Sequence, residues 1–250
     1  MLGAIANIAK LKEAIAKADT TRFNSTLPIS IKVLKKLDKA FYQLQLGNKE
    51  YSTKSLKELE VGGKYWGDFN KSKEGIINIS NLIKKPKMLQ KGDFVLQFNE
   101  KALLELIQTK DPKGVLKSLI LEQLSTAKSK NEFMQLTNML IALEDGIFTI
   151  PYKDDGINAV LQYKKSKKNK SNNKSNSIEF YAAFDNLGPI DGKLYLYDDT
   201  LKGDISCKYS KTASLLDSIK DELSFDINLS IGDEVSPLSE LDSSLLDLKC

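Results

Sequence analysis

The feature that most constrains the fold is the alternation of apolar and polar residues in the last hundred residues of the chain. Successive side chains of a β-strand point to opposite faces of a sheet, so a period of two predicts strands. The segments that predict strands are "IFTIPY", "INAVLQY", "SIEFYAAF", "GKLYLYD", "LKGDISCKYS" and "FDINLSIG". Asp154-Asp155-Gly156 is a good hairpin loop between the first two segments. Before the last strand, "KTASLLDSIKDEL" predicts a helix with Leu215, Leu216, Ile219 and Leu223 on one face.

Residues 99–146 carry helix signals and predict a subdomain of about three helices. Each apolar run follows a side chain that can cap a helix, namely Asn99, Asp111 and Ser129. Pro112 follows the second cap, where the missing N–H costs nothing, and Glu132 completes a capping box with Ser129. Gly146 ends the last run.

The first hundred residues predict helices followed by a small β module. Residues 2–18 predict one amphipathic helix, with Leu2, Ile5, Ile8, Leu11 and Ile15 on its apolar stripe. Residues 28–46 predict a second, with Ile31, Leu34, Leu37, Phe41 and Leu44 facing inward. Neither stripe can be buried by its own helix, so each must pack on the chain, on the other helix or on a partner. The segments "YWGDF", "GIINI" and "GDFVLQF" then predict three strands of a compact module, with a small barrel as one form.

Together these segments predict an α+β fold in five parts. The parts are N-terminal helices (1–55), a small β module (56–98), a helical subdomain (99–146), a C-terminal mixed β-sheet packed by one helix (147–231) and an acidic flexible tail (232–250). The lysine run from Lys164 to Lys174 predicts a mobile, solvated loop. No apolar run reaches the ~20 residues that span a bilayer, so we expect no membrane insertion.

The chain contains no histidine, which removes several kinds of catalytic site. Without imidazole there is no Ser-His or Cys-His pair and no histidine metal ligand. Cys207 and Cys250 fit no zinc spacing. The segment "VGGKYWG" has Glu58 and Tyr65 where a phosphate-binding loop needs glycine and Ser or Thr. We therefore expect no enzyme activity, no cofactor and no metal site.

The positive charge of the chain comes almost entirely from lysine. The net charge is +4, and Arg22 is the only arginine. Bidentate recognition of phosphate or guanine favours the arginine fork, and the lysine run has no interleaved aromatic residue on which bases could stack. We expect no specific nucleic-acid partner and keep weak, lysine-driven nucleic-acid binding as an alternative, which would be lost steeply with salt.

A distinctive order of elements occupies the stretch "FYAAFDNLGPIDGKLYLYDDTLKGDISCKYSKTASLLDSIKDELSFDINLSI". An alternating strand is followed by Leu-Gly-Pro-Ile, two further strands, a helix with paired leucines and a closing strand. This order resembles the C-terminal domain of flagellar hook-length control proteins, over about residues 147–231. In that family a leucine-glycine and a β-branched residue stand where Leu187, Gly188 and Ile190 stand here.

The resemblance implies a non-enzymatic role in a bacterial cytoplasm. Members of the family pass through the flagellar type III export apparatus, limit hook length and contact the export gate to switch it to filament-type substrates. The implied partner is therefore a gate component, with the oligomeric state and export without a cleaved signal left open. The residues that would bind protein or define the domain are Leu187, Gly188, Pro189, Ile190, Leu194 and Leu196.

The first part of the chain sets it apart from typical members of that family. Their N-terminal half is long and of low complexity and acts as a ruler, whereas residues 1–146 here are predicted to fold. A helix rises only ~1.5 Å per residue against ~3.3 Å for extended chain, so a folded half is a poor ruler unless it unfolds in transit. We therefore expect a divergent or paralogous relative. The alternative is a cytoplasmic, non-enzymatic interaction or chaperone-like module.

Overall fold

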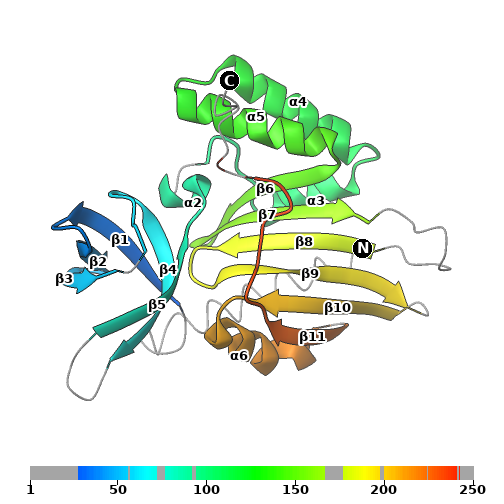
Figure 1. Ribbon diagram of the computed structural model, residues 1–250. Coiled ribbons are helices and arrows are strands. Elements are labelled where there is room, and N and C mark those ends of the chain that lie inside the picture. Colours follow the sequence, from blue (N-terminus) through cyan, green and yellow to red (C-terminus); the bar gives the residue numbers. More distant parts are fainter. Residues whose placement is uncertain are drawn as a thin grey trace.

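The computed structural model describes residues 28–55, 57–71, 77–91, 94–166, 177–197, 200–223, 225–240 and 242. The fold is α+β, as predicted, and is built on two β-sheets (Figure 1). The first sheet contains β1 (Ile29–Lys36), β2 (Phe41–Leu46), β3 (Lys49–Lys54), β4 (Lys64–Lys71) and β5 (Ile77–Lys84). The second contains β6 (Ile147–Asp154), β7 (Ile157–Lys165), β8 (Ser177–Phe184), β9 (Gly188–Tyr197), β10 (Thr200–Cys207) and β11 (Asp226–Ile231).

Along the chain, one group of helices connects the two sheets, and another helical segment connects two strands of the second sheet. Between β5 and β6 the chain forms α2 (Lys87–Lys91), α3 (Glu100–Gln108), α4 (Pro112–Ser125) and α5 (Lys130–Glu144). Between β10 and β11 it forms α6 (Ser210–Ile219) and the short 3₁₀ helix η1 (Lys220–Glu222). The predicted caps of α3, α4 and α5 are confirmed. The side chains of Asn99, Asp111 and Ser129 each accept a hydrogen bond from the N–H three residues later, at 2.9, 2.9 and 3.2 Å.

The first sheet is antiparallel and has a small core of its own. Its order is β3-β2-β1-β4-β5, which leaves β3 and β5 as the two edges of an open sheet rather than closing a barrel. The buried residues of its core are Ile31, Val33, Tyr42, Leu44, Leu59 and Tyr65. The predicted hairpin of "YWGDF" and "GIINI" is confirmed as β4 and β5.

The predicted helix over residues 28–46 is wrong, because this stretch forms β1 and β2. Ile29, Ile31 and Val33 are β-branched and alternate with polar residues, which favours a strand over a helix. Leu37 and Phe41, two members of the predicted helical stripe, are 47% and 46% exposed. The expected N-terminal helical part (1–55) is thus three strands wherever it is described.

Three other expectations have mixed outcomes. In "GDFVLQF", the described residues 94–98 form no strand, and Phe98 makes only an isolated bridge to Tyr152. The predicted helix over residues 2–18 lies outside the described residues. The lysine run begins in β7, and its portion from residue 167 onward also lies outside them.

The second sheet is mixed, as predicted, in the order β11-β10-β9-β8-β7-β6. Every pair is antiparallel except β10 and β11, which run parallel because α6 carries the chain across and packs on both. The register separates two faces. Phe148, Tyr163, Phe180, Ile205 and Leu229 share what we call the apolar face, whose neighbouring row includes Ile178 and Leu194. The opposite, polar face carries Thr149, Gln162, Tyr181, Asp191 and Ser206.

The chain after β11 crosses the polar face as a strap, which we define as residues 233–240. Figure 1 shows this red segment running across the strands from β11 toward α4 and α5. The Gln162 side chain donates to the carbonyl oxygen of Ser239 at 3.1 Å and accepts from its N–H at 3.3 Å. Val235 and Leu238 are partly buried against the core. Part of the tail that was predicted to be flexible (232–250) thus contacts the second sheet, and residues 243–250 lie outside the described part.

Candidate functional site at the joint between the sheets

The two sheets are joined through Trp66 of β4, the only tryptophan of the chain. Its side chain is fully buried, in the core of the second sheet rather than in that of its own. The indole N–H donates to the carbonyl oxygens of Phe184 at 3.0 Å and Asp185 at 2.9 Å. These carbonyls belong to the last residue of β8 and the first residue of the turn that follows it, so the tryptophan fixes the start of that turn to the first sheet.

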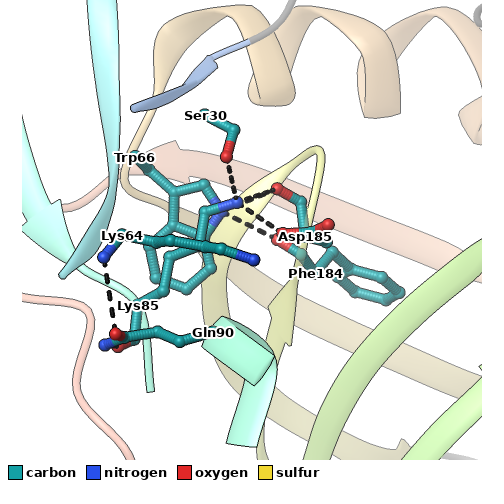
Figure 2. Close-up of polar contacts among 7 residues, drawn as sticks. All are labelled: Ser30, Lys64, Trp66, Lys85, Gln90, Phe184 and Asp185. Atoms are coloured by element: carbon teal, nitrogen blue, oxygen red, sulfur yellow. Dashed lines mark hydrogen bonds and ion pairs between the residues drawn. The ribbon is translucent and has the colours of Figure 1, made fainter. Parts of the chain in front are cut away.

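Lys85, directly after β5, reinforces the same joint (Figure 2). Its side chain is fully buried, and its ammonium lies 5.4 Å from the centroid of the Trp66 ring. The ammonium donates to Ser30 Oγ at 2.9 Å and to the carbonyl oxygen of Asp185 at 2.9 Å, and it forms an ion pair with the Asp185 carboxylate. Burial lowers the pKa of Lys85, while Asp185 opposes that shift.

The geometry assigns Lys85 a structural role. A lysine ammonium has three N–H donors, and three protein oxygens accept them here. No donor is left for a substrate, so the arrangement can hold two sheets together but offers no free amine for chemistry.

We expect Asp185→Ala to lower the free energy of unfolding by about 3 kcal/mol, because the buried ammonium would lose its counter-ion. This is the low end of the range for broken buried pairs, since the Asp185 side chain is 35% exposed. Urea unfolding followed by the fluorescence of Trp66 measures this loss of stability, because Trp66 lies at the joint.

The matched control for this prediction is Lys85→Met, which removes the buried charge and keeps most of the volume. It is expected to cost about 1 kcal/mol or less, because a replaced buried ion pair is often nearly neutral. Adding Asp185→Ala to Lys85→Met should then cost little more. Equal losses from Asp185→Ala with and without Lys85 would contradict the pairing.

The predicted residues Leu187, Gly188, Pro189 and Ile190 lie together at this joint, where the chain enters β9. All four are buried. Gly188 has φ +79°, and a Cβ built on it would lie 2.6 Å from the ring of Tyr209. The carbonyl oxygen of Leu187 accepts a hydrogen bond from Thr212 Oγ1 of α6 at 2.6 Å.

Tyr209 makes a second link between the first sheet and residues 187–190, which we call the corner. Its ring is fully buried against Gly188, and its hydroxyl donates to the carbonyl oxygen of Asn81 in β5 at 2.9 Å. The corner is thus enclosed by α6 on one side and by the first sheet on the other. The corner residues therefore shape the joint and are not accessible to a partner.

Leu194 and Leu196 do not join this cluster. They lie farther along β9 on the apolar face, where Leu194 is partly buried and Leu196 is 44% exposed. The six predicted site residues therefore divide into four that form the corner and two that are accessible at the surface.

Sequence reasoning did not find Trp66, Lys85, Asp185 or Tyr209. The single tryptophan was a usable signal, because a large indole in a small sheet usually finds a partner for its N–H. Lys85 gave no signal, since it stands in a lysine-rich connection and nothing local distinguishes it from its solvated neighbours.

Cys207, at the end of β10, is buried on the apolar face, and burial raises the pKa of its thiol to about 11. In a Cys250→Ser background at pH 8, we expect Ellman's reagent to react with it about 100-fold more slowly than with an ordinary thiol, because only the thiolate reacts. The same sample in urea should react quickly and completely. Rapid reaction of the folded protein would contradict this burial.

Within the described ranges, no group of three or more His, Cys, Asp or Glu residues could hold a metal ion. Among the helices that the structure describes, none is both long and apolar enough to cross a membrane. Comparisons of the chain with protein-family models, with curated proteins and with solved structures gave no match.

Proposed function

We propose that this protein regulates flagellar type III export by binding a component of the export gate through its C-terminal sheet, without catalysing a reaction. The supporting observation is the order β8, buried corner, β9, β10, α6 and β11, which follows the order of elements in the hook-length control resemblance. On this proposal the protein acts in a bacterial cytoplasm, can leave through the flagellar apparatus without a cleaved signal, and needs no cofactor.

The burial of the predicted residues supports a division of roles within this proposal. Leu187, Gly188, Pro189 and Ile190 hold the domain in shape, because they are enclosed at the joint. Leu196 is the member of the set with the most accessible side chain, and Leu194 lies beside it on the same face. The gate contact is therefore assigned to the Leu194–Leu196 end of β9.

The test in cells is deletion of the gene in its native host, which should give abnormally long hooks with few filaments. A plasmid copy should restore normal hooks, and a copy with Leu196→Asp should not. The matched control is Leu37→Asp, since Leu37 is 47% exposed but lies in the first part of the chain, between β1 and β2. Normal hooks and filaments in the deletion strain would rule the proposal out.

The test in solution is binding of the purified protein to the cytoplasmic domain of the export gate. Leu196→Asp should weaken binding by about tenfold or more, because a charge would be buried at the interface. Leu37→Asp should bind like the parent protein. Circular dichroism of both variants controls for folding.

The second candidate is a cytoplasmic interaction or chaperone-like module. It is supported by the first sheet, which has its own buried core and is a poor ruler in its folded form. Secretion separates the two candidates. The export regulator should be found intact in flagellar export fractions, whereas an interaction module should stay in the cell.

A further inference from the structure

Within the described residues the two sheets end in four edge strands, and three of these are protected against pairing with another chain. In β3, the exposed Lys49 and Lys54 place charges on the strand. In β5, a register shift against β4 and the positive φ of Asn81 (52°) make a bulge. In β6, Pro151 has no N–H to offer, and its carbonyl oxygen accepts a hydrogen bond from the N–H of Phe98 at 2.9 Å. Each is a device by which natural sheets avoid edge-to-edge association.

The fourth edge strand, β11, carries none of these devices. Figure 1 shows it as the last strand of the second sheet, and no described strand pairs with its outer side. Its register with β10 is unbroken from Asp226 to Ile231, and its sequence, DINLSI, contains no proline and no lysine. Ile231, at its end, is 62% exposed, more than any other large apolar side chain in the described ranges. An edge of this kind is a template for another strand.

The outward-pointing backbone groups of β11 belong to the residues that carry its apolar side chains. The N–H of Gly232 donates to the carbonyl oxygen of Cys207 in β10 at 3.0 Å. Backbone groups of a strand point alternately to its two sides, so those of Ile227, Leu229 and Ile231 point outward, away from β10. The side chains of these three residues lie on the apolar face. A strand added here would therefore extend the backbone ladder and the apolar face at the same time.

We infer that β11 pairs with β11 of a second copy of this chain, antiparallel and centred on Leu229, so that the second sheets of the two copies become one continuous sheet. In this register Leu229 lies opposite its own copy, and Ile227 lies opposite Ile231. These pairs exchange both backbone hydrogen bonds, because their N–H and carbonyl groups point outward. On the polar face, Asn228 lies opposite Ser230. A two-fold axis relates the two copies, as in most homodimers.

The charge of β11 and the position of α6 favour a second copy as the partner. Asp226, the single charged residue of the strand, falls opposite Gly232 of the copy, so like charges do not meet across the ladder. The helix α6 packs on β10 and β11. With strands ~4.8 Å apart, a helix above the boundary between β10 and β11 would lie ~10 Å from its copy, a normal distance between packed helices. The two helices therefore fit side by side over the extended sheet.

Disulfide trapping on the full chain tests the register. Asn228→Cys and Ser230→Cys, both at exposed positions, are made in a Cys250→Ser background, where the remaining Cys207 is buried. The proposed register brings the Cα of residue 228 to ~4.5 Å from the Cα of residue 230 in the copy, which fits a disulfide. Oxidation of the two variants mixed together should therefore give a cross-linked dimer of one chain of each kind. Either variant alone should cross-link about tenfold less, because identical positions are diagonal neighbours ~7–8 Å apart.

A charge at the edge gives an independent readout. An interface of one strand pair and one helix pair is small, so we expect a weak dimer that is seen by sedimentation at about 100 μM and dissociates on dilution. Ile231→Lys places an ammonium in the new ladder, opposite Ile227, and should weaken association by about tenfold or more. Val61→Lys is the matched control, because Val61 is 53% exposed and lies before β4 in the first sheet. This variant should associate like the parent protein.

Each result decides for or against the pairing of β11 with its copy. Trapping of the mixed cysteine variants, together with loss of the dimer in Ile231→Lys, would establish it. A parent protein that stays monomeric, unchanged association of Ile231→Lys, or equal cross-linking of mixed and single variants would overturn it. Circular dichroism of both lysine variants controls for folding. All these measurements use the protein alone, so their failure is distinct from failure of the gate-binding tests.

Discussion

Trp66→Ala is expected to lower the free energy of unfolding by about 4 kcal/mol, the largest effect of any single change proposed for this chain. The substitution removes a fully buried indole and leaves a cavity between the two sheets. It also removes the donor shared by the carbonyl oxygens of Phe184 and Asp185 and the ring that faces the Lys85 ammonium. Urea unfolding followed by far-ultraviolet circular dichroism measures the loss.

Trp66→Phe is the control that separates packing from hydrogen bonding. Phenylalanine refills much of the space but donates nothing, so we expect a loss of about 2 kcal/mol. A cost below about 1 kcal/mol for Trp66→Ala would mean that the joint contributes little to stability, contrary to its burial.

Gly188→Ala is expected to cost about 3 kcal/mol, from two sources. At φ +79° a Cβ is strained by about 1 kcal/mol or somewhat more. In addition, that Cβ would lie 2.6 Å from the buried ring of Tyr209, and such overlap in a packed core costs about 1–3 kcal/mol. Thermal and urea unfolding both measure the total loss of stability from the two sources.

Gly146 offers a matched control for this prediction, because its φ is also +79° and a Cβ there would meet nothing within 4 Å. Gly146→Ala should therefore cost about 1 kcal/mol, from backbone strain alone. The difference between the two variants isolates the overlap with Tyr209. Equal losses would show that the ring of Tyr209 moves aside freely.

Local signals made much of the fold predictable. The helices α3, α4 and α5 begin at Asn99, Asp111 and Ser129, whose side chains accept the hydrogen bonds that a cap requires. The strands of the second sheet follow from alternation, since one face is apolar and the other carries residues such as Gln162 and Asp191. These features depend on neighbours in sequence.

The prediction for the first sheet failed because its sequence fits both the helical period and the strand period. Ile31 and Leu34 have the spacing of one helix face, while Ile29, Ile31 and Val33 have that of a strand. The strand forms because β1 gains partners on both sides, β2 and β4, and those pairings are invisible to a local window. The strap was missed for a similar reason, because its acidic, serine-rich sequence gives no sign that Gln162 bonds to the backbone of Ser239.

The joint could not be predicted because its parts are far apart along the chain. Trp66 meets a carbonyl oxygen 119 residues away, Lys85 one 100 residues away, and Tyr209 one 128 residues away. Leu187 to Ile190 were found through a resemblance, and their place in the joint emerged only from the structure.

The strap also gives the molecule a direction of mechanical weakness. A pulling force applied beyond residue 242 would load the contacts at Asp242, Ser239 and Ser236 one after another, so the strap should peel at low force. A force applied at Pro28 would instead load β1, which is bonded to a strand on each side and must shear both ladders together. Threading through a narrow channel would therefore be easier from the C-terminal side of the described chain than from its N-terminal side.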